Sequence, residues 1–103
     1  MATGILGQSA PSAATNTTVY TVPAGKVGIF SVSICNRGST LANIRMAISA
    51  TGTPSNAEYI EYDTEVPANS VFERTGLVAQ ATKNLVVYAD STSLSVSVYG
   101  YEE

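Results

Sequence analysis

Four acidic residues that lie close together are the strongest candidates for a chemical site. They are Glu58, Glu61, Asp63 and Glu65. Carboxylates so near one another could hold Ca²⁺, and two of them could act as acid and base across a glycosidic bond. However, the stretch lacks the Asp-x-Asp-x-Asp-Gly pattern of a calcium loop. Acidic residues on the outer face of a strand, facing solvent or a basic partner, explain it better, so we predict no metal site and no catalytic site.

The composition removes the other common catalytic groups. The chain contains no histidine, which excludes the usual general base near neutral pH and any Ser-His-Asp or Cys-His arrangement. Its single cysteine, Cys35, has no neighbour that would stabilise a thiolate, and we interpret it as a small apolar residue at a strand end. We therefore predict that the chain is not an enzyme and binds no cofactor.

Two tyrosines near the C-terminus are candidates for contact with another molecule. Tyr99 and Tyr101 share the outward parity of Ser95 and Ser97 on the last predicted strand. Tyrosine offers a large contact area at a small entropic cost and is enriched in interfaces. Two alternatives remain open. The rings could cover the edge of their own sheet, or they could form a carbohydrate-binding platform, which the absence of tryptophan weakens.

The first 16 residues are rich in Ala, Ser, Thr, Gly and Asn and show no period. This composition predicts an extended N-terminal arm over residues 1–16, with Ile5 and Leu6 as an apolar anchor that orders against a neighbouring subunit. The alternative is a frayed terminus.

The remainder, residues 17–103, shows strand signals at a spacing near ten residues. Apolar and small polar residues alternate clearly in Phe30–Ile34, Ile44–Ile48 and Leu94–Val98. The predicted strands cover residues 17–22, 27–36, 42–50, 59–62, 71–74, 85–89 and 93–101. Such spacing predicts an all-β fold, an antiparallel two-sheet β-sandwich of Ig-like or jelly-roll-like type with seven to eight short strands.

Three local features accompany these strands. The segments Val22–Lys26 and Val66–Ser70 share a Val-Pro-Ala turn, which we interpret as a corner that sends the chain from one sheet to the other. A change of parity near Gly28 predicts a bulge in the strand that follows. Residues 77–83 could hold a short helical turn.

The charge pattern favours contact with other protein. Charged residues make up 13% of the chain, against about 25% in an average domain. The outward strand positions carry mostly Ser, Ala, Thr and Asn, with little of the Lys and Glu that keep sheets apart. The five basic residues are scattered and no apolar run is long enough to span a bilayer, so we expect neither nucleic acid nor membrane as a partner.

Five segments together resemble a known class of protein. They are Val22–Lys26, Ser33–Gly38, Ala47–Pro54, Glu58–Asp63 and Glu73–Leu77. From about Thr17 onward the chain resembles small virion structural proteins of tailed bacteriophages, including cyanophages. The resemblance implies a β-sandwich subunit of a phage particle, but it carries no site motif and does not choose between head, neck, tail and fibre.

We therefore expect a non-enzymatic structural protein of the virion, most specifically a capsid decoration or cement protein. A tail, neck, baseplate or fibre component is the alternative within this class, and a carbohydrate-binding module for host adsorption is the alternative outside it. The expected partners are the major capsid protein or other virion proteins and further copies of the chain, with a trimer favoured. The single cysteine and the absence of a secretion-signal pattern lead us to expect synthesis in the host cytoplasm.

Overall fold

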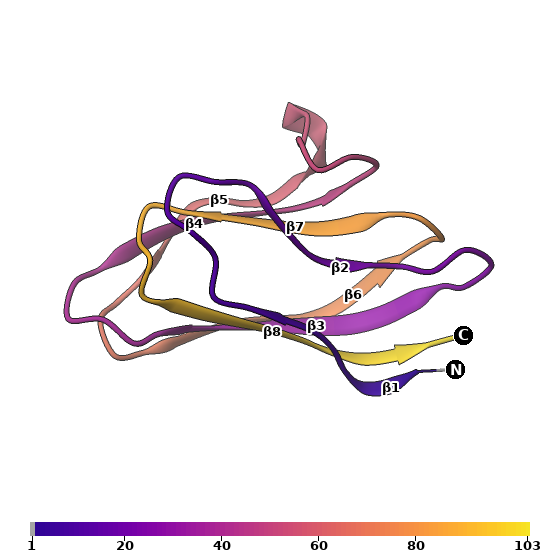
Figure 1. The fold of residues 1–103 in the computed structure, drawn as a ribbon, viewed down its shortest axis with the longest axis horizontal. Coiled ribbons are helices and arrows are strands. Elements are labelled where there is room, and N and C mark those ends of the chain that lie inside the picture. Colours follow the sequence, from indigo (N-terminus) through magenta and orange to yellow (C-terminus); the bar gives the residue numbers. More distant parts are fainter. Residues whose placement is uncertain (1) are drawn as a thin grey trace.

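The computed structural model describes residues 2–103, which form two antiparallel sheets packed face to face (Figure 1). The strands are β1 (Thr3–Ser9), β2 (Thr17–Thr21), β3 (Gly28–Asn36), β4 (Ala42–Ser49), β5 (Tyr59–Val66), β6 (Val71–Ala79), β7 (Asn84–Ala89) and β8 (Leu94–Glu102). One short 3₁₀ helix, η1 (Asn56–Glu58), precedes β5. Within the described range, no helix has the length and apolar character needed to cross a membrane. The predicted all-β, two-sheet sandwich is confirmed.

The strands pair as in one long antiparallel hairpin: the first strand pairs with the last, and each later strand pairs with the one that precedes the previous partner. β1 pairs with β8, β2 with β7, β3 with β6 and β4 with β5. The pairings β3 with β8 and β4 with β7 then join these hairpins into sheet A, of order β1-β8-β3-β6, and sheet B, of order β2-β7-β4-β5. This is the double Greek key of a jelly roll, one of the two sandwich types expected.

One face of every strand contributes to the space between the sheets. On β3, Phe30, Val32 and Ile34 are buried while the residues between them are half-exposed, and Leu94–Val98 on β8 repeats the alternation. Burial of this apolar surface is the main favourable term in folding. The inward side chains are buried in the core, so another molecule can contact only outward side chains, strand edges and loops.

The two related corner segments connect sheets as expected. Residues 22–25 follow β2 of sheet B and lead to β3 of sheet A, and residues 66–69 lead from β5 of sheet B to β6 of sheet A. Their valines are buried, and their fourth residues, Gly25 and Asn69, have positive φ angles of 76° and 57°. Proline ends the ladder in both cases because it has no N–H to donate.

The N-terminal segment is not the free arm that its composition predicts. Thr3–Ser9 form an edge strand of sheet A that pairs with β8. Leu6 packs against the core, whereas Ile5 is 59% exposed on the outer face, because successive strand residues face opposite sides. The edge of β8 offers unpaired backbone N–H and C=O groups, and pairing with them requires no apolar periodicity in the partner strand. Met1, part of the predicted arm, lies outside the described residues.

The predicted bulge lies on a different strand. Phe30 pairs with Leu77 but Val32 pairs with Arg74, so β6 rather than β3 carries the extra residue. Gly76 in this bulge has a φ of 73°, a conformation that glycine adopts without strain. The parity change near Gly28 is no bulge of β3, because Val27 and Ile29 face outward while Gly28 and Phe30 face inward.

Residues 77–83 do not form a helical turn. They contain the end of β6, which extends to Ala79, and a tight turn in which Thr82 has a φ of 70°.

A buried hydrogen bond joins the sheets at the end of the sandwich where the C-terminus lies. Tyr20 of β2 donates its hydroxyl to Glu102 of β8, with 2.6 Å between the oxygens, and both residues are 6% exposed. Burial, together with the hydrogen bond to Glu102 and its charge, raises the pKa of Tyr20 far above its ordinary value. Gly28 lies against this pair, since a Cβ there would approach the Tyr20 hydroxyl to 3.1 Å.

A buried amide organises the opposite end. Asn36 is fully buried and donates to the carbonyl oxygens of Thr40 and Val66, at 2.9 and 3.0 Å. Its carbonyl oxygen accepts from the N–H of Gly38 at 2.9 Å and from the Ser93 hydroxyl at 3.3 Å. The amide thus uses both donors and both lone pairs, and it holds three connecting segments together.

The pairing of β1 with β8 predicts different effects on stability for substitutions at the neighbouring residues Ile5 and Leu6. Leu6→Ala should lower the free energy of unfolding by about 1–2 kcal/mol, because a half-buried side chain loses its packing on the core. Ile5→Ala should change it by less than about 0.5 kcal/mol, because that side chain is exposed. Urea denaturation followed by circular dichroism measures both values, and equal effects of the two substitutions would contradict this placement.

Candidate functional site

Glu58 is a structural residue of the loop between β4 and β5. Its carboxylate accepts hydrogen bonds from the Ser49 hydroxyl at 2.8 Å and from the backbone N–H groups of Ser55 and Ala50, at 2.9 and 3.1 Å. These bonds, that of the Ser55 N–H foremost, lower the pKa of Glu58 to about 2. The carboxylate is therefore engaged in holding the loop.

This loop covers one half of the outer face of sheet B. Ala47 and Val86 pair with each other on the side of the sheet away from the core, yet they are only 0% and 1% exposed. The loop containing η1 lies over this side in Figure 1, and a Cβ on Gly52 would come within 3.7 Å of the Thr18 hydroxyl on β2. Only the other half of the face remains open.

The remaining acidic residues do not converge. Glu61 of β5 forms an ion pair with Arg74 of β6, which links the edges of the two sheets, and Asp63 forms one with Arg45 at 2.7 Å. The side chain of Glu65 makes no hydrogen bond with another residue in the range 2–103. Over that range, no group of three or more His, Cys, Asp and Glu residues could hold a metal ion. The acidic stretch is thus divided between loop closure, edge pairing and the outer face of sheet B.

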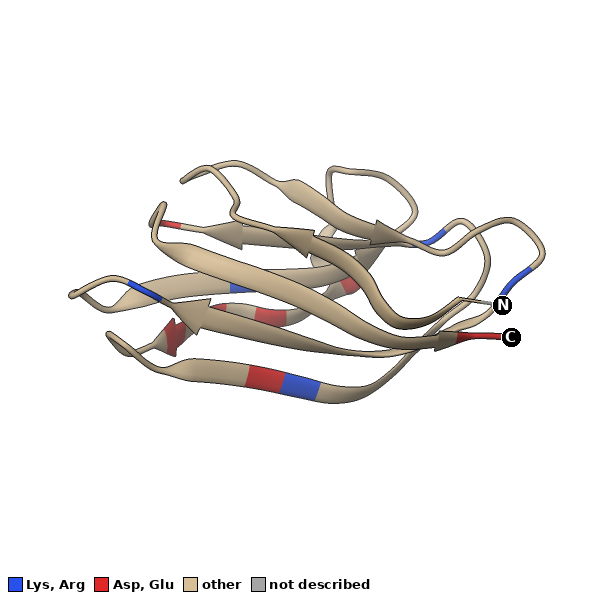
Figure 2. Ribbon diagram, turned by 60° about the horizontal axis from the view of Figure 1, so that its bottom comes forward, with Lys and Arg blue, Asp and Glu red and all other residues tan. Residues whose placement is uncertain are grey.

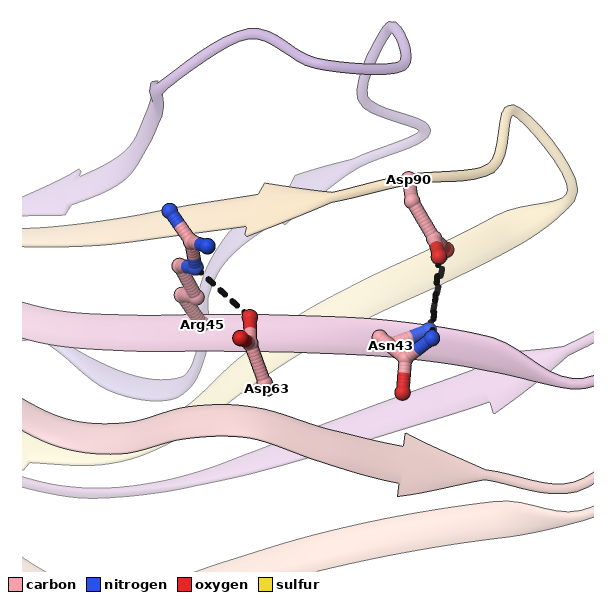
Figure 3. A network of polar contacts seen from close by, with 4 residues as sticks. All are labelled: Asn43, Arg45, Asp63 and Asp90. Atoms are coloured by element: carbon pink, nitrogen blue, oxygen red, sulfur yellow. Dashed lines mark hydrogen bonds and ion pairs between the residues drawn. The ribbon is translucent and has the colours of Figure 1, made fainter.

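The open half of the outer face of sheet B contains a polar hollow of about 340 Å³. Its lining consists of Asn43, Arg45, Asp63, Tyr88 and Asp90. Figure 3 shows two polar pairs that lie along β4: Asp63 of β5 reaches Arg45, and Asp90, which follows β7, reaches Asn43. Three adjacent segments of one sheet thus converge on this hollow.

Arg45 is held in place on three sides. Its Nε donates to Asp63 at 2.7 Å, and its guanidinium carbon lies 4.1 Å from the ring centre of Tyr62 and 5.0 Å from that of Tyr88. Cation–π contact with two rings favours the charged guanidinium. The hydrogen bond to Asp63 is the main cause that raises the pKa of Arg45.

Asp90 is fixed by Asn43. One carboxylate oxygen accepts from the Asn43 backbone N–H at 2.9 Å and the other from its side-chain amide at 3.0 Å, while the Asp90 N–H donates back to the Asn43 carbonyl at 3.2 Å. The bonds to the carboxylate lower the pKa of Asp90. Asp90 is therefore a charged acceptor held at the rim of the hollow.

The outer face of sheet A carries exposed apolar side chains. Ile29 on β3 lies between Tyr101 on β8 and Val78 on β6, and Ile5 on β1 lies opposite Tyr99 on β8. Tyr101, Ile5 and Val78 are 41%, 59% and 62% exposed. These five residues, which we call the apolar face, extend across all strands of the sheet. Three of the four predicted interface residues, Ile5, Tyr99 and Tyr101, are therefore brought together, and Leu6 is not.

Charge is sparse around the apolar face. Figure 2 shows β8 without charged residues until its end at the C-terminus. Among the outward positions of the described strands of sheet A, the one charged residue is Glu73, which accepts a hydrogen bond from the Tyr99 hydroxyl at 2.7 Å. That bond raises the pKa of Tyr99. Tyr99 thus satisfies its hydroxyl within its own sheet, while its ring lines a shallow hollow of about 210 Å³.

Cys35 lies on the same outer face, half-buried between Ser95 of β8 and Val71 of β6. It is a small side chain in a sheet of small side chains, which agrees with its interpretation as a packing residue.

Comparison with protein-family models, with curated proteins and with solved structures finds no significant match for this chain.

Sequence reasoning missed the polar hollow. It noted Asp63 within the acidic cluster but gave no role to Asn43, Arg45 or Asp90. One signal was present, because Asn43 and Arg45 share a parity on a predicted strand, and Asp90 directly follows the predicted strand 85–89 in the parity of Tyr88. That β4, β5 and β7 are neighbours could not be read from this parity.

The lowered pKa of Glu58 predicts a pH-dependent contribution to stability. Its folded-state pKa of about 2 lies below its ordinary value of 4.5, so its stabilisation is fully present above pH 4.5 and is lost as the pH falls toward 2. Glu58→Gln should destabilise the protein at neutral pH, because the amide NH₂ would face backbone N–H donors. The difference in the free energy of unfolding between wild type and Glu58→Gln should shrink as the pH falls from 4.5 toward 2.

Urea denaturation at a series of pH values measures this difference. Glu65→Gln serves as the matched control, because the Glu65 carboxylate makes no hydrogen bond with another described residue. A difference between wild type and Glu58→Gln that is constant from pH 7 to pH 2 would rule out the hydrogen-bonded carboxylate as its source.

Proposed function

We propose that the chain is a non-enzymatic structural subunit of a bacteriophage virion, most specifically a decoration subunit that binds the outside of the capsid through sheet A. The observation that carries the proposal is the apolar face, where Ile5, Val78 and Tyr101 are exposed on neighbouring strands. Contiguous exposed apolar side chains mark surfaces for protein association.

The polar residues around this face also suit burial against protein. β3 and β8 present the serines Ser31, Ser33, Ser95 and Ser97 outward, each half-buried already. Small hydroxyls can be covered by a partner at far lower cost than unpaired charges. The exposed aromatic Tyr101 adds the type of side chain that most often dominates binding energy.

The acidic cluster singled out from the sequence does not converge on one site, which supports a non-enzymatic role. Glu58, Glu61 and Asp63 are each engaged within the chain by loop closure or an ion pair. Jelly rolls also serve capsid and lectin domains, an analogy at the level of the fold alone. A tail, neck, baseplate or fibre subunit could use the same face, and the position of the subunit in the particle distinguishes these roles.

The proposal predicts that the protein is found on the particle. A cryo-EM map of the phage that encodes the chain should show its two-layered density on the outside of the capsid, with sheet A toward the capsid surface. Density at the tail, neck or baseplate would replace the decoration role with the alternative. Absence of the chain from purified particles by mass spectrometry would refute the proposal.

Substitutions on the apolar face should weaken this attachment. Val78→Lys and Tyr101→Lys should each reduce binding to particles stripped of the subunit by about tenfold or more, because a buried anchor is replaced by a charge. The matched control is Leu41→Lys, which changes a side chain of similar exposure, 46%, outside this face. Equal losses for all variants would contradict a specific role of sheet A.

As an alternative occupant of the apolar face, in place of the capsid surface, we propose further copies of the chain in a closed trimer. Closed symmetry buries such a face without open-ended growth. Sedimentation of the wild-type protein at micromolar concentration should give the mass of a trimer, and Ile5→Lys should shift it toward the monomer. A wild-type monomer at that concentration would contradict self-association.

A further inference from the structure

The polar hollow on sheet B has the features of a binding site rather than of a chance gap between side chains. Charged groups of its lining are held by neighbours: Arg45 by Asp63 and Asp90 by Asn43 (Figure 3). Tyr88 forms part of its wall. Sites for small ligands combine an aromatic wall with a few convergent polar groups that are fixed before the ligand arrives.

Arg45 leaves free donors in this hollow. Of its guanidinium nitrogens only Nε donates to a residue in the range 2–103, and the side chain is 29% exposed. Both terminal nitrogens are therefore open to a ligand, and their directions are set by the contacts with Tyr62, Tyr88 and Asp63. A guanidinium cannot accept a hydrogen bond, so the ligand must offer an acceptor.

The carboxylates of Asp63 and Asp90 require hydrogen-bond donors on the ligand. Asp63 accepts one bond through one oxygen, and each oxygen of Asp90 accepts one bond from Asn43. An ionised carboxylate offers about four acceptor sites, so both side chains retain free acceptor capacity. They cannot donate while ionised, so the ligand must also offer donors.

A hydroxyl group meets both requirements, because it accepts through its oxygen and donates through its hydrogen. The lining carries one positive and two negative side chains, so an anion would meet net repulsion. An ammonium group only donates, so it would leave the free donors of Arg45 without an acceptor. We propose that the polar hollow binds the adjacent hydroxyls of a neutral sugar, with Arg45 as donor and Asp63 and Asp90 as acceptors.

This site is independent of the proposed role in the virion. It lies on the outer face of sheet B, opposite the apolar face of sheet A, so one subunit could bind protein and sugar at the same time. Failure to bind sugar would therefore not contradict the proposed virion role, and failure to bind the particle would not contradict the sugar site.

Titration of the ¹⁵N-labelled protein by NMR tests the proposal. The probes are the methyl glycosides of mannose, glucose and galactose, with glucuronate and glucosamine as charged counterparts of the glucose probe. At least one neutral glycoside should cause saturable shifts at the amides of Asn43, Arg45, Tyr88 and Asp90, and should bind more tightly than both charged sugars. Shifts that map elsewhere, no saturable shift with any neutral probe, or preference for a charged sugar would each overturn it.

Variants separate direct contact from a structural effect. Arg45→Lys keeps the charge but loses the planar fork, and Asp90→Asn keeps the shape but loses an acceptor, so each should weaken binding by about tenfold or more. Glu65→Gln, a change of charge on the neighbouring β5 position outside the lining, should leave affinity unchanged. Unaltered affinity in both Arg45→Lys and Asp90→Asn would overturn the assignment, and if one variant fails to fold, the other decides.

Discussion

A single core between two sheets is the constraint on which the rest of this structure depends. Each strand contributes side chains to that core, and residues such as Val32, Ile44 and Val98 are completely buried there. Because the period of a strand is two, the other half of the residues must face away. Each strand is therefore divided between a stabilising face and a face that is free to carry function, and both proposed binding surfaces lie on the latter.

The two sheets must be joined at the ends and edges of the sandwich, and polar side chains make several of these contacts. Tyr20 with Glu102 closes one end and Asn36 the other. The ion pair between Arg74 and Glu61 joins β6 to β5, so the charges at the edge link the two sheets. Buried polar groups of this kind stabilise only when their hydrogen bonds are satisfied, and no buried side-chain atom in the described range lacks a partner.

The two outer faces have opposite character. Sheet A presents apolar and small hydroxyl side chains, with Glu73 bound to Tyr99. Sheet B is half covered by the loop that Glu58 holds, and its open half gathers Arg45, Asp63 and Asp90. An apolar face gains free energy when another protein removes it from water, whereas fixed donors and acceptors discriminate small polar ligands. The division suits a subunit that attaches by one side and presents the other.

The sequence alone determined what depends on parity and local turn chemistry. The alternation on β3 and β8, the outward direction of Tyr99 and Tyr101 and the corners at Pro23 and Pro67 all followed from neighbouring residues. The tertiary structure alone decided which strands lie side by side. It gave Thr3–Ser9 a place beside β8, dispersed the acidic residues, and brought Asn43, Arg45, Asp63 and Asp90 to one hollow. The reason is physical: parity is a property of one strand, whereas a site on a sheet is set by backbone pairing between segments distant in the chain.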